Sequence, residues 1–345
     1  MKLRAPRTPR ECFQLLSLFD PGRGLDALLD RLDWSGANPR QLYSSILGRL
    51  PETAATAVAG EGYVPREQAS ALLLSDEYLR KVFRLGLEAF PEKRRLLFAH
   101  IPKCAGTDLI GHLSPRYAWL DENLGREDPP PAKVLFGHLM EFALRAEQAE
   151  MIFMSGHVGL NWYLSKELYR YGDRLITTIR HPHDIAVSMA NYVLKRFAED
   201  PECKNSGPKG WAKTLEMESF DPTIPPEALR ELGHRIVAEP RIVVPNRLCT
   251  FLGSGTADSA IEMMARCDIE LTETSRYNSW LKNAWGIGKA TRSNASPAVI
   301  SWADLPEQTR ATFSEACRED IKLYEHIVGR MEKKGEDSIF GPELI

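Results

Sequence analysis

The chain has 345 residues, of which 43% are hydrophobic and 26% charged, and this is the composition of an ordinary globular protein. Its 44 Lys and Arg nearly balance 47 Asp and Glu, so the formal net charge of −3 gives no overall field that favours nucleic acid or an anionic membrane. Any anion-binding site must therefore be local. The 6 cysteines show neither CxxC nor Cys/His metal spacing, which indicates free thiols in a reducing compartment and no metal site.

Membrane and nucleic-acid partners are not expected. No uncharged apolar run approaches the roughly 20 residues that span a bilayer, and no apolar segment follows the basic residues 1–10. We therefore expect a cytoplasmic protein without a transmembrane segment. The sequence leaves its oligomeric state open.

Apolar residues at helical spacing predict a helical N-terminal region over residues 1–92. From residue 93 the pattern changes to short apolar runs followed by turns and helical stretches, which is typical of an α/β domain with a central parallel sheet flanked by helices. The predicted strands are 96–100, 151–154, 175–179 and 268–271. We expect this domain to cover 93–332 and to close with one long helix over 306–331, and we expect the charged tail, 333–345, to fray.

The end of the first predicted strand has the character of a phosphate-binding loop. In an open α/β sheet, ligands bind beyond the carboxyl ends of the strands. Residues 100–108 read HIPKCAGTD, in which small residues let backbone N–H groups approach an anion, a helix start adds partial positive charge, and a lysine adds a full charge. The alternative is an ordinary loop with a solvated lysine, and the Walker motif GxxxxGK[ST] is absent. The candidate contacts are Lys103, Cys104, Ala105, Gly106, Thr107 and Asp108.

A second candidate anion contact follows the strand predicted at 175–179. Arg180 lies at its end, Pro182 suits the first turn of a helix, and Ser188 lies about two turns along that helix. An arginine with a serine hydroxyl suits a phosphate monoester. Taken singly, Arg180 fits equally well as a salt-bridge partner and Ser188 as a surface residue.

A histidine after the strand predicted at 151–154 is the candidate base. His157 follows Gly156 and can exchange a proton near neutral pH, although a lone histidine is more often structural. Gly137-His138 is a similar pair, and we favour His157 because a clear apolar strand precedes it.

In this order the motifs resemble the carbohydrate sulfotransferases that use 3′-phosphoadenosine-5′-phosphosulfate (PAPS), the family that includes heparan sulfate 2-O-sulfotransferase and bacterial relatives. The family's HIPKTAGTS corresponds to HIPKCAGTD, its RDPxxRxxS to RHPHDIAVS at 180–188, and its GHV to residues 156–158. The resemblance covers about residues 94–327, with weaker echoes at Asn246-Arg247, at 268–273 and at 320–324. The sequence departs from the family pattern in three places: Asp108 replaces Ser or Thr, His181 replaces Asp, and Asp184-Ile185 lacks the frequent second Arg.

The resemblance implies a P-loop-like sulfotransferase fold, PAPS as the cosubstrate without a metal, and a saccharide or glycoconjugate hydroxyl as the acceptor. It implies that the loop holds the 5′-phosphosulfate, that Lys103 touches the bridging oxygen, that Arg180 and Ser188 bind the 3′-phosphate, and that His157 is the catalytic base. Lys289 and Arg292 in the segment 286–294 could reach a phosphate, and an exposed basic loop is the alternative. The residues that could stack on a sugar, and that fit equally as core, are Trp119, Trp162, Tyr163 and Trp280.

Two other functions are compatible with such a loop. A nucleotide-dependent kinase or glycosyltransferase is disfavoured because the Walker Lys-Ser/Thr pair and an acidic Mg²⁺ motif are absent. A non-catalytic binding module is the third possibility. Substitution of His157 separates it from an enzyme, because a binding module would be indifferent to that change.

Overall fold

The computed structural model describes residues 3–16, 24–34, 36–53, 63–75, 77–78, 90–121, 132–165, 168–170, 172–288 and 297–345. The chain divides into two compact units, one formed by residues 1–96 with 113–155 and the other by residues 97–112 with 156–345. No described helix combines the length and the apolar character needed to cross a membrane.

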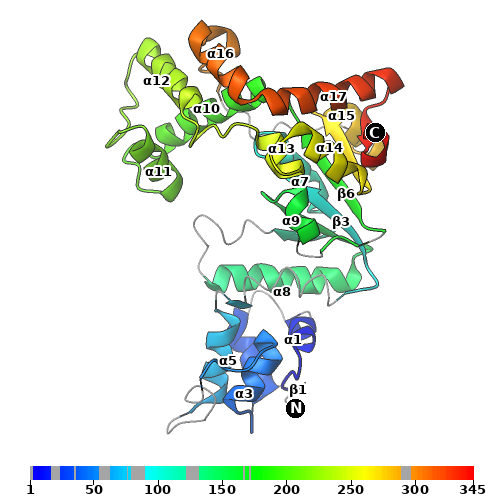
Figure 1. The fold of residues 1–345 in the computed structure, drawn as a ribbon. Helices are drawn as coiled ribbons and strands as arrows, with labels where there is room; N and C mark the ends of the chain where they lie inside the picture. Colours follow the sequence, from blue (N-terminus) through cyan, green and yellow to red (C-terminus); the bar gives the residue numbers. More distant parts are fainter. Residues whose placement is uncertain are drawn as a thin grey trace. The chain divides into compact units, whose positions relative to one another are not determined.

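The described residues form a mostly parallel sheet whose strand order is β4-β5-β3-β6-β7-β8, with helices flanking it (Figure 1). The pairs β4–β5 and β6–β7 are parallel, and β8 adds an antiparallel edge to β7. The strands are β3 (Arg94–Ala99), β4 (Ala118–Asp121), β5 (Met151–Gly156), β6 (Arg174–Ile179), β7 (Ile269–Glu273) and β8 (Ser338–Phe340). The predicted α/β class and all four predicted strands are confirmed, and β4 and β8 are additional.

The strand order places β3 at a switch point of the topology. The chain adds β5 on one side of β3 and then β6 on the other side. In open α/β sheets, ligands bind at the carboxyl end of the strands where the connections diverge in this way. The residues that follow β3 and β6 therefore occupy the expected ligand-binding edge.

The first unit contains the N-terminal region, whose described residues are mainly helical. Its helices are α1 (Pro9–Leu16), α2 (Gly24–Arg31), α3 (Pro39–Leu42), α5 (Pro65–Leu73) and α8 (Ala132–Gln148), with the π-helix η2 (Tyr43–Leu47) and the parallel pair β1 (Leu3–Arg4) and β2 (Leu32–Asp33). Phe13 of α1 packs against Phe90 and Phe142, with ring centroids 6.2 and 5.8 Å away. Residues 79–89, within the predicted helical region, lie outside the described residues.

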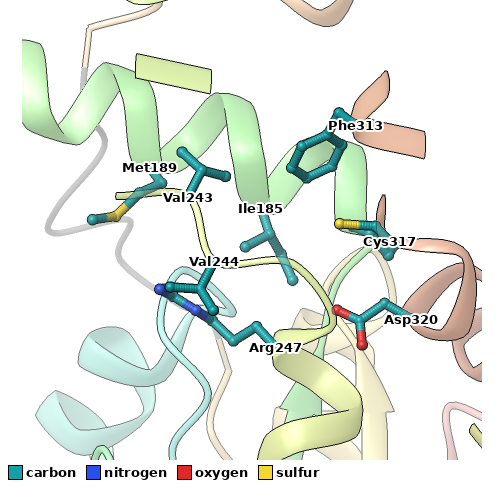
Figure 2. Close-up of a pocket in the computed structure, with 9 residues that line it drawn as sticks. Ile185, Met189, Val243, Val244, Arg247, Phe313, Cys317 and Asp320 are labelled. Atoms are coloured by element: carbon teal, nitrogen blue, oxygen red, sulfur yellow. The ribbon is translucent and has the colours of Figure 1, made fainter. Parts of the chain in front are cut away.

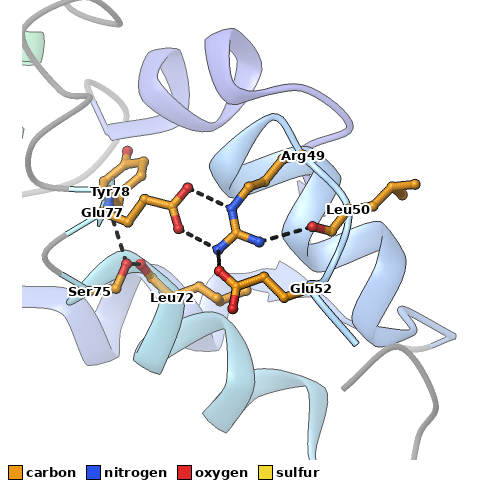
Figure 3. Close-up of polar contacts among 7 residues, drawn as sticks. All are labelled: Arg49, Leu50, Glu52, Leu72, Ser75, Glu77 and Tyr78. Atoms are coloured by element: carbon orange, nitrogen blue, oxygen red, sulfur yellow. Dashed lines mark hydrogen bonds and ion pairs between the residues drawn. The ribbon is translucent and has the colours of Figure 1, made fainter. Parts of the chain in front are cut away.

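A polar contact also joins distant segments of the first unit (Figure 3). Arg49, after η2, donates to both carboxylate oxygens of Glu77 at 2.7 and 2.5 Å and to the carbonyl of Leu50 at 2.9 Å. A bidentate arginine–carboxylate pair fixes geometry more strongly than a single contact does. Arg49 is thereby held in its described position.

The second unit contains the residues after β3 and β5 and most of the helices. These are α7 (Gly106–Leu113), α9 (Leu160–Ser165), α10 (Pro182–Glu199), α11 (Ser206–Thr214), α12 (Pro226–Ala238), α13 (Arg247–Leu252), α14 (Ala257–Ala265), α15 (Tyr277–Trp285), α16 (Glu307–Ala316) and α17 (Arg318–Lys334), with the short 3₁₀ helices η3 (Trp302–Asp304) and η4 (Gly341–Leu344). Ala190, Val193 and Phe197 of α10 form a buried core with Ile236 and Val237 of α12.

The C-terminal part of the chain differs from the prediction in two ways. The single helix expected over 306–331 is two helices, because Cys317 adopts φ −101° and ψ 16° and ends α16 before α17 begins. The tail does not fray after residue 332, since β8 pairs with β7 and the side chains of Ile339 and Leu344 are buried. Long-range strand pairing and apolar burial therefore order the segment 333–345, although its charged composition predicts a frayed tail.

Candidate active site

The loop between β3 and α7 is held in a strained backbone conformation. Lys103 and Ala105 have φ values of 70° and 61°, in the left-handed region that favours glycine. Such conformations cost about 1–3 kcal/mol each and cluster at functional sites. The hydroxyl of Thr178, in the neighbouring strand β6, donates to the carbonyl of the fully buried Cys104 between them. A hydrogen bond from the central sheet thus helps to fix the conformation of the loop.

The start of α7 presents backbone donors. The N–H groups of Asp108 and Leu109 donate to the carbonyl of Ala105 at 3.1 and 3.2 Å. In contrast, the N–H groups of Ala105, Gly106 and Thr107 donate to no residue that the structure describes. Three N–H groups at a helix start can receive an anion, as the sequence predicts for this loop.

Asp108 is engaged elsewhere. Its carboxylate lies 3.5 Å from Nε2 of His112, one turn along α7, and is mostly buried. Burial, followed by the charge of Asp108, raises the pKa of Tyr277 on α15. Because its N–H closes the first turn and its carboxylate faces His112, Asp108 offers no free donor, and its predicted contact with a cofactor gains no support from these contacts.

Lys103 lies among other cationic side chains. Its ammonium group is 4.1 Å from the ring centroid of Tyr192 on α10, a cation–π contact. Burial, then the positive charges of Arg180 and Lys195, lower the pKa of Lys103 to about 8. Because these cations repel one another, an anion bound among them would relieve the repulsion.

Arg180 follows β6, as predicted, and its side chain is 35% exposed. Its Nε lies 3.9 Å from the Oδ2 atom of Asp184, which is beyond hydrogen-bond distance, and such exposed pairs contribute about 0–1 kcal/mol. Ser188, one turn after Asp184 on α10, is half-buried, and its hydroxyl has no hydrogen-bond partner among the described residues. Both candidate groups for the 3′-phosphate therefore retain donors for a ligand.

His157 follows β5 and is exposed to solvent. Its ring centroid lies 4.3 Å from that of His100, which is 5% exposed and stacks on Phe98 at 5.1 Å. Burial, then the charges of His157 and Lys103, hold the pKa of His100 well below its usual value, so His100 is neutral. His157 is thus the accessible imidazole of the pair and the one placed to exchange a proton.

The competing histidine has a different environment. His138 lies on an exposed position within α8, in the other unit, so the residues directly before it are helical. Of the two histidines, only His157 therefore directly follows a strand, which is the position that the sequence analysis expected of the base.

The structure also identifies residues that the sequence analysis did not assign. Tyr192 and Lys195 lie one and two turns after Ser188 on α10. Their spacing from Ser188 could have predicted from the sequence that all three lie on one face of the helix. Thr178 and His100 act through contacts between segments far apart in sequence, which spacing alone does not reveal. Lys289 and Arg292 lie outside the described residues.

Comparison with known proteins supplies no assignment, because no protein-family model and no curated protein sequence matches this chain. Within the described ranges, no group of three or more His, Cys, Asp and Glu side chains is placed to hold a metal ion.

Proposed function

We propose that this protein is a PAPS-dependent sulfotransferase that transfers a sulfuryl group to an acceptor hydroxyl, on a saccharide or glycoconjugate. The observation that carries the proposal is the loop after β3, where Lys103, the free N–H groups of residues 105–107 and Arg180 gather at the switch point of the sheet. The order of the sequence motifs adds to it, and we extend the proposal to a P-loop-like sulfotransferase fold and a cytoplasmic location.

Two sets of anion-binding groups suit a nucleotide with two separate anionic groups. Lys103 and the N–H groups at the start of α7 would hold the 5′-phosphosulfate, since helix starts and lysines both bind phosphate oxygens. Arg180 and Ser188 would hold the 3′-phosphate, because both keep donors that no described residue uses.

In the proposed reaction, His157 accepts the proton of the acceptor hydroxyl while the hydroxyl oxygen forms a bond to sulfur. The bond between sulfur and the oxygen of the 5′-phosphate breaks, and its electron pair stays on that oxygen, where the positive charge of Lys103 stabilises it. The products are the sulfate ester of the acceptor and 3′-phosphoadenosine-5′-phosphate, and the proton remains on His157. Positioning of the two reactants supplies much of the rate enhancement.

The acceptor class rests on the family resemblance more than on exposed aromatic residues. Tyr163 and Trp280 are fully buried, and the indole N–H of Trp119 donates to Ser155 at 2.9 Å. Trp162 is half-buried, and its ring contacts that of Tyr163 edge-on at 5.4 Å. Burial therefore removes Tyr163 and Trp280 as groups that could stack on a sugar.

The decisive experiment is calorimetric titration with 3′-phosphoadenosine-5′-phosphate, followed by transfer assays with labelled PAPS and a panel of saccharides. We expect saturable binding of the nucleotide and label in at least one saccharide. ATP and UDP-sugars serve as competing nucleotides, since a kinase or glycosyltransferase would prefer one of them. Absence of binding to 3′-phosphoadenosine-5′-phosphate would overturn the proposal.

A further inference from the structure

Arg247, the first residue of α13, lines an apolar cleft beside α10 (Figure 2). The other residues that line the cleft include Pro182, Ile185 and Met189 of α10 with Val243, Val244 and Phe313. Arg247 is half-buried there, and this burial lowers the pKa of its guanidinium. A half-buried cation in an apolar cleft is costly unless a partner compensates it.

The charge of Asp320 partly offsets the effect of burial on the pKa of Arg247, but no described residue forms a hydrogen bond or an ion pair with the guanidinium. Asp320 lines the same cleft, but its carboxylate accepts the N–H groups of Leu248 and Cys249 at 3.0 and 2.8 Å. Figure 2 shows the Arg247 side chain extending away from Asp320, on the side of Val244. Its five N–H donors are therefore available to a ligand.

The free guanidinium lies within electrostatic reach of the candidate phosphate loop. Burial raises the pKa of the Cys104 thiol to about 12, and the positive charges of Arg180 and then Arg247 oppose that rise. Two arginines from separate segments, one after β6 and one on α13, thus act on the same loop residue. The cleft that Arg247 lines is bounded by the first turns of α10, the helix that carries Ser188.

We propose that Arg247 is a further binding residue for the nucleotide and contacts the 3′-phosphate together with Arg180 and Ser188. The inference rests on the proposed function. A phosphate monoester carries close to two negative charges, so it can balance the positive charges of two guanidinium groups. A single carboxylate carries one negative charge and can balance only one. The planar fork of arginine donors matches phosphate oxygens. The first turns of α10 favour the 3′-phosphate over the 5′-group, because Arg180 and Ser188 flank them.

The test compares two ligands and two arginines. Calorimetry measures the affinity of 3′-phosphoadenosine-5′-phosphate and of adenosine 5′-phosphosulfate, which lacks the 3′-phosphate, for the full chain and its variants. Arg247→Ala should weaken binding of the first ligand roughly 10- to 100-fold and leave the second unchanged. Arg241→Ala is the matched control, because Arg241 lies in the same segment, is exposed, and pairs with Glu239 at 2.7 Å. It should change neither affinity.

A stability measurement separates a ligand contact from a structural role. Removal of an unpaired, half-buried charge should leave the free energy of unfolding of the ligand-free protein unchanged or higher. Equal affinity of wild type and Arg247→Ala for 3′-phosphoadenosine-5′-phosphate would overturn the inference alone. Equal weakening of both ligands, or a loss of stability with the loss of binding, would also overturn it. Failure of the wild type to bind either nucleotide would instead refute the proposed function, and the inference with it.

Discussion

The imidazole of His100 packs so closely against Gly106 that a Cβ atom at position 106 would overlap its Cδ2 and Nε2 atoms. The same ring contacts His157, so one buried imidazole touches both the start of α7 and the candidate base. Because glycine has no side chain, position 106 allows the ring of His100 to pack against the candidate phosphate loop. This contact connects the nucleotide side and the acceptor side of the proposed site.

Gly106→Ala should therefore destabilise the protein, because the added methyl group forces His100 or the first turn of α7 to move. Overpacking of this kind costs about 1–3 kcal/mol, measurable by chemical denaturation. Gly111→Ala is the matched control in the same helix, where a Cβ would meet nothing within 4 Å. This second change should stabilise the helix by about 0.5–1 kcal/mol. Equal stability of Gly106→Ala and wild type would show that the ring moves aside at no cost.

Lys103 should make nucleotide binding dependent on pH. Its pKa is lowered from 10.5 to about 8, so the protonated form that attracts an anion is lost as the pH rises through 8. Affinity for 3′-phosphoadenosine-5′-phosphate should fall between pH 7 and 9.5, a range above the second phosphate pKa of about 6. The ligand-free protein should behave oppositely: the folded state disfavours the charged lysine, so this group's contribution to stability rises between about pH 8 and 10.5.

The control for that pH dependence is Lys103→Met, which cannot titrate. Its nucleotide affinity should be weaker than that of the wild type and flat over the same range. Cys104, the neighbouring thiol, has its pKa raised to about 12 by burial and does not ionise in this range. A wild-type affinity that is constant from pH 7 to 9.5 would contradict the assignment of Lys103 to the anion site.

Arg180→Ala should weaken nucleotide binding much more than Ser188→Ala. A hydrogen bond to a charged group contributes about 1.5–3 kcal/mol, and a neutral one about 0.5–1.5 kcal/mol. Adenosine 5′-phosphosulfate should bind wild type and Arg180→Ala about equally, because it lacks the 3′-phosphate. A large difference between the two proteins for this ligand, measured by calorimetry, would mean that Arg180 contacts another part of the nucleotide.

The sequence predicts the inner strands well because they are buried on both faces. The residues of β5 are all buried, and its first four, 151–154, form a continuous apolar run. β7 is equally buried, but its sequence IELTE alternates apolar and polar residues and is a weaker signal. The sequence analysis did not predict β4. Its four residues alternate between buried and half-buried positions, and so short an alternation is only a weak indication of a strand. β8 lies in a charged tail and obtains its order from pairing with β7, which no local pattern encodes.

The sequence also predicts part of the candidate site. Lys103, Arg180 and His157 each follow a strand, so topology brings them to one edge of the sheet. The left-handed conformation of the loop was not predictable, since Lys103 and Ala105 are not residue types that favour it. The neighbouring cation Arg247 lies more than a hundred positions along the chain from the loop, and only the tertiary fold places its charge near Cys104.

The N-terminal helices should not contribute to nucleotide binding. Every described candidate site residue belongs to the unit formed by 97–112 with 156–345, whereas Phe13 packs in the other unit. Deletion of residues 1–89 would remove Phe13 from Phe142 on α8, so Phe13→Ala is the cleaner test. This change should destabilise the first unit by about 3–5 kcal/mol, seen as faster hydrogen exchange in α8. Nucleotide affinity of the folded variant should be unchanged; a loss would place part of the site in the first unit.

The final prediction assigns one chemical step to His157. If it is the general base, His157→Ala should retain nucleotide affinity while the transfer rate falls roughly 10²–10⁴-fold, the usual contribution of positioned proton transfer. The two properties should separate because His157 follows β5, whereas Lys103 and Arg180 follow β3 and β6. His138→Ala is the matched control, since it changes the other Gly-His pair at an exposed position of α8. Turnover at saturating PAPS and affinity for 3′-phosphoadenosine-5′-phosphate are measured for both variants. Near-wild-type turnover in His157→Ala, or a larger loss in His138→Ala, would assign the proton transfer to another group.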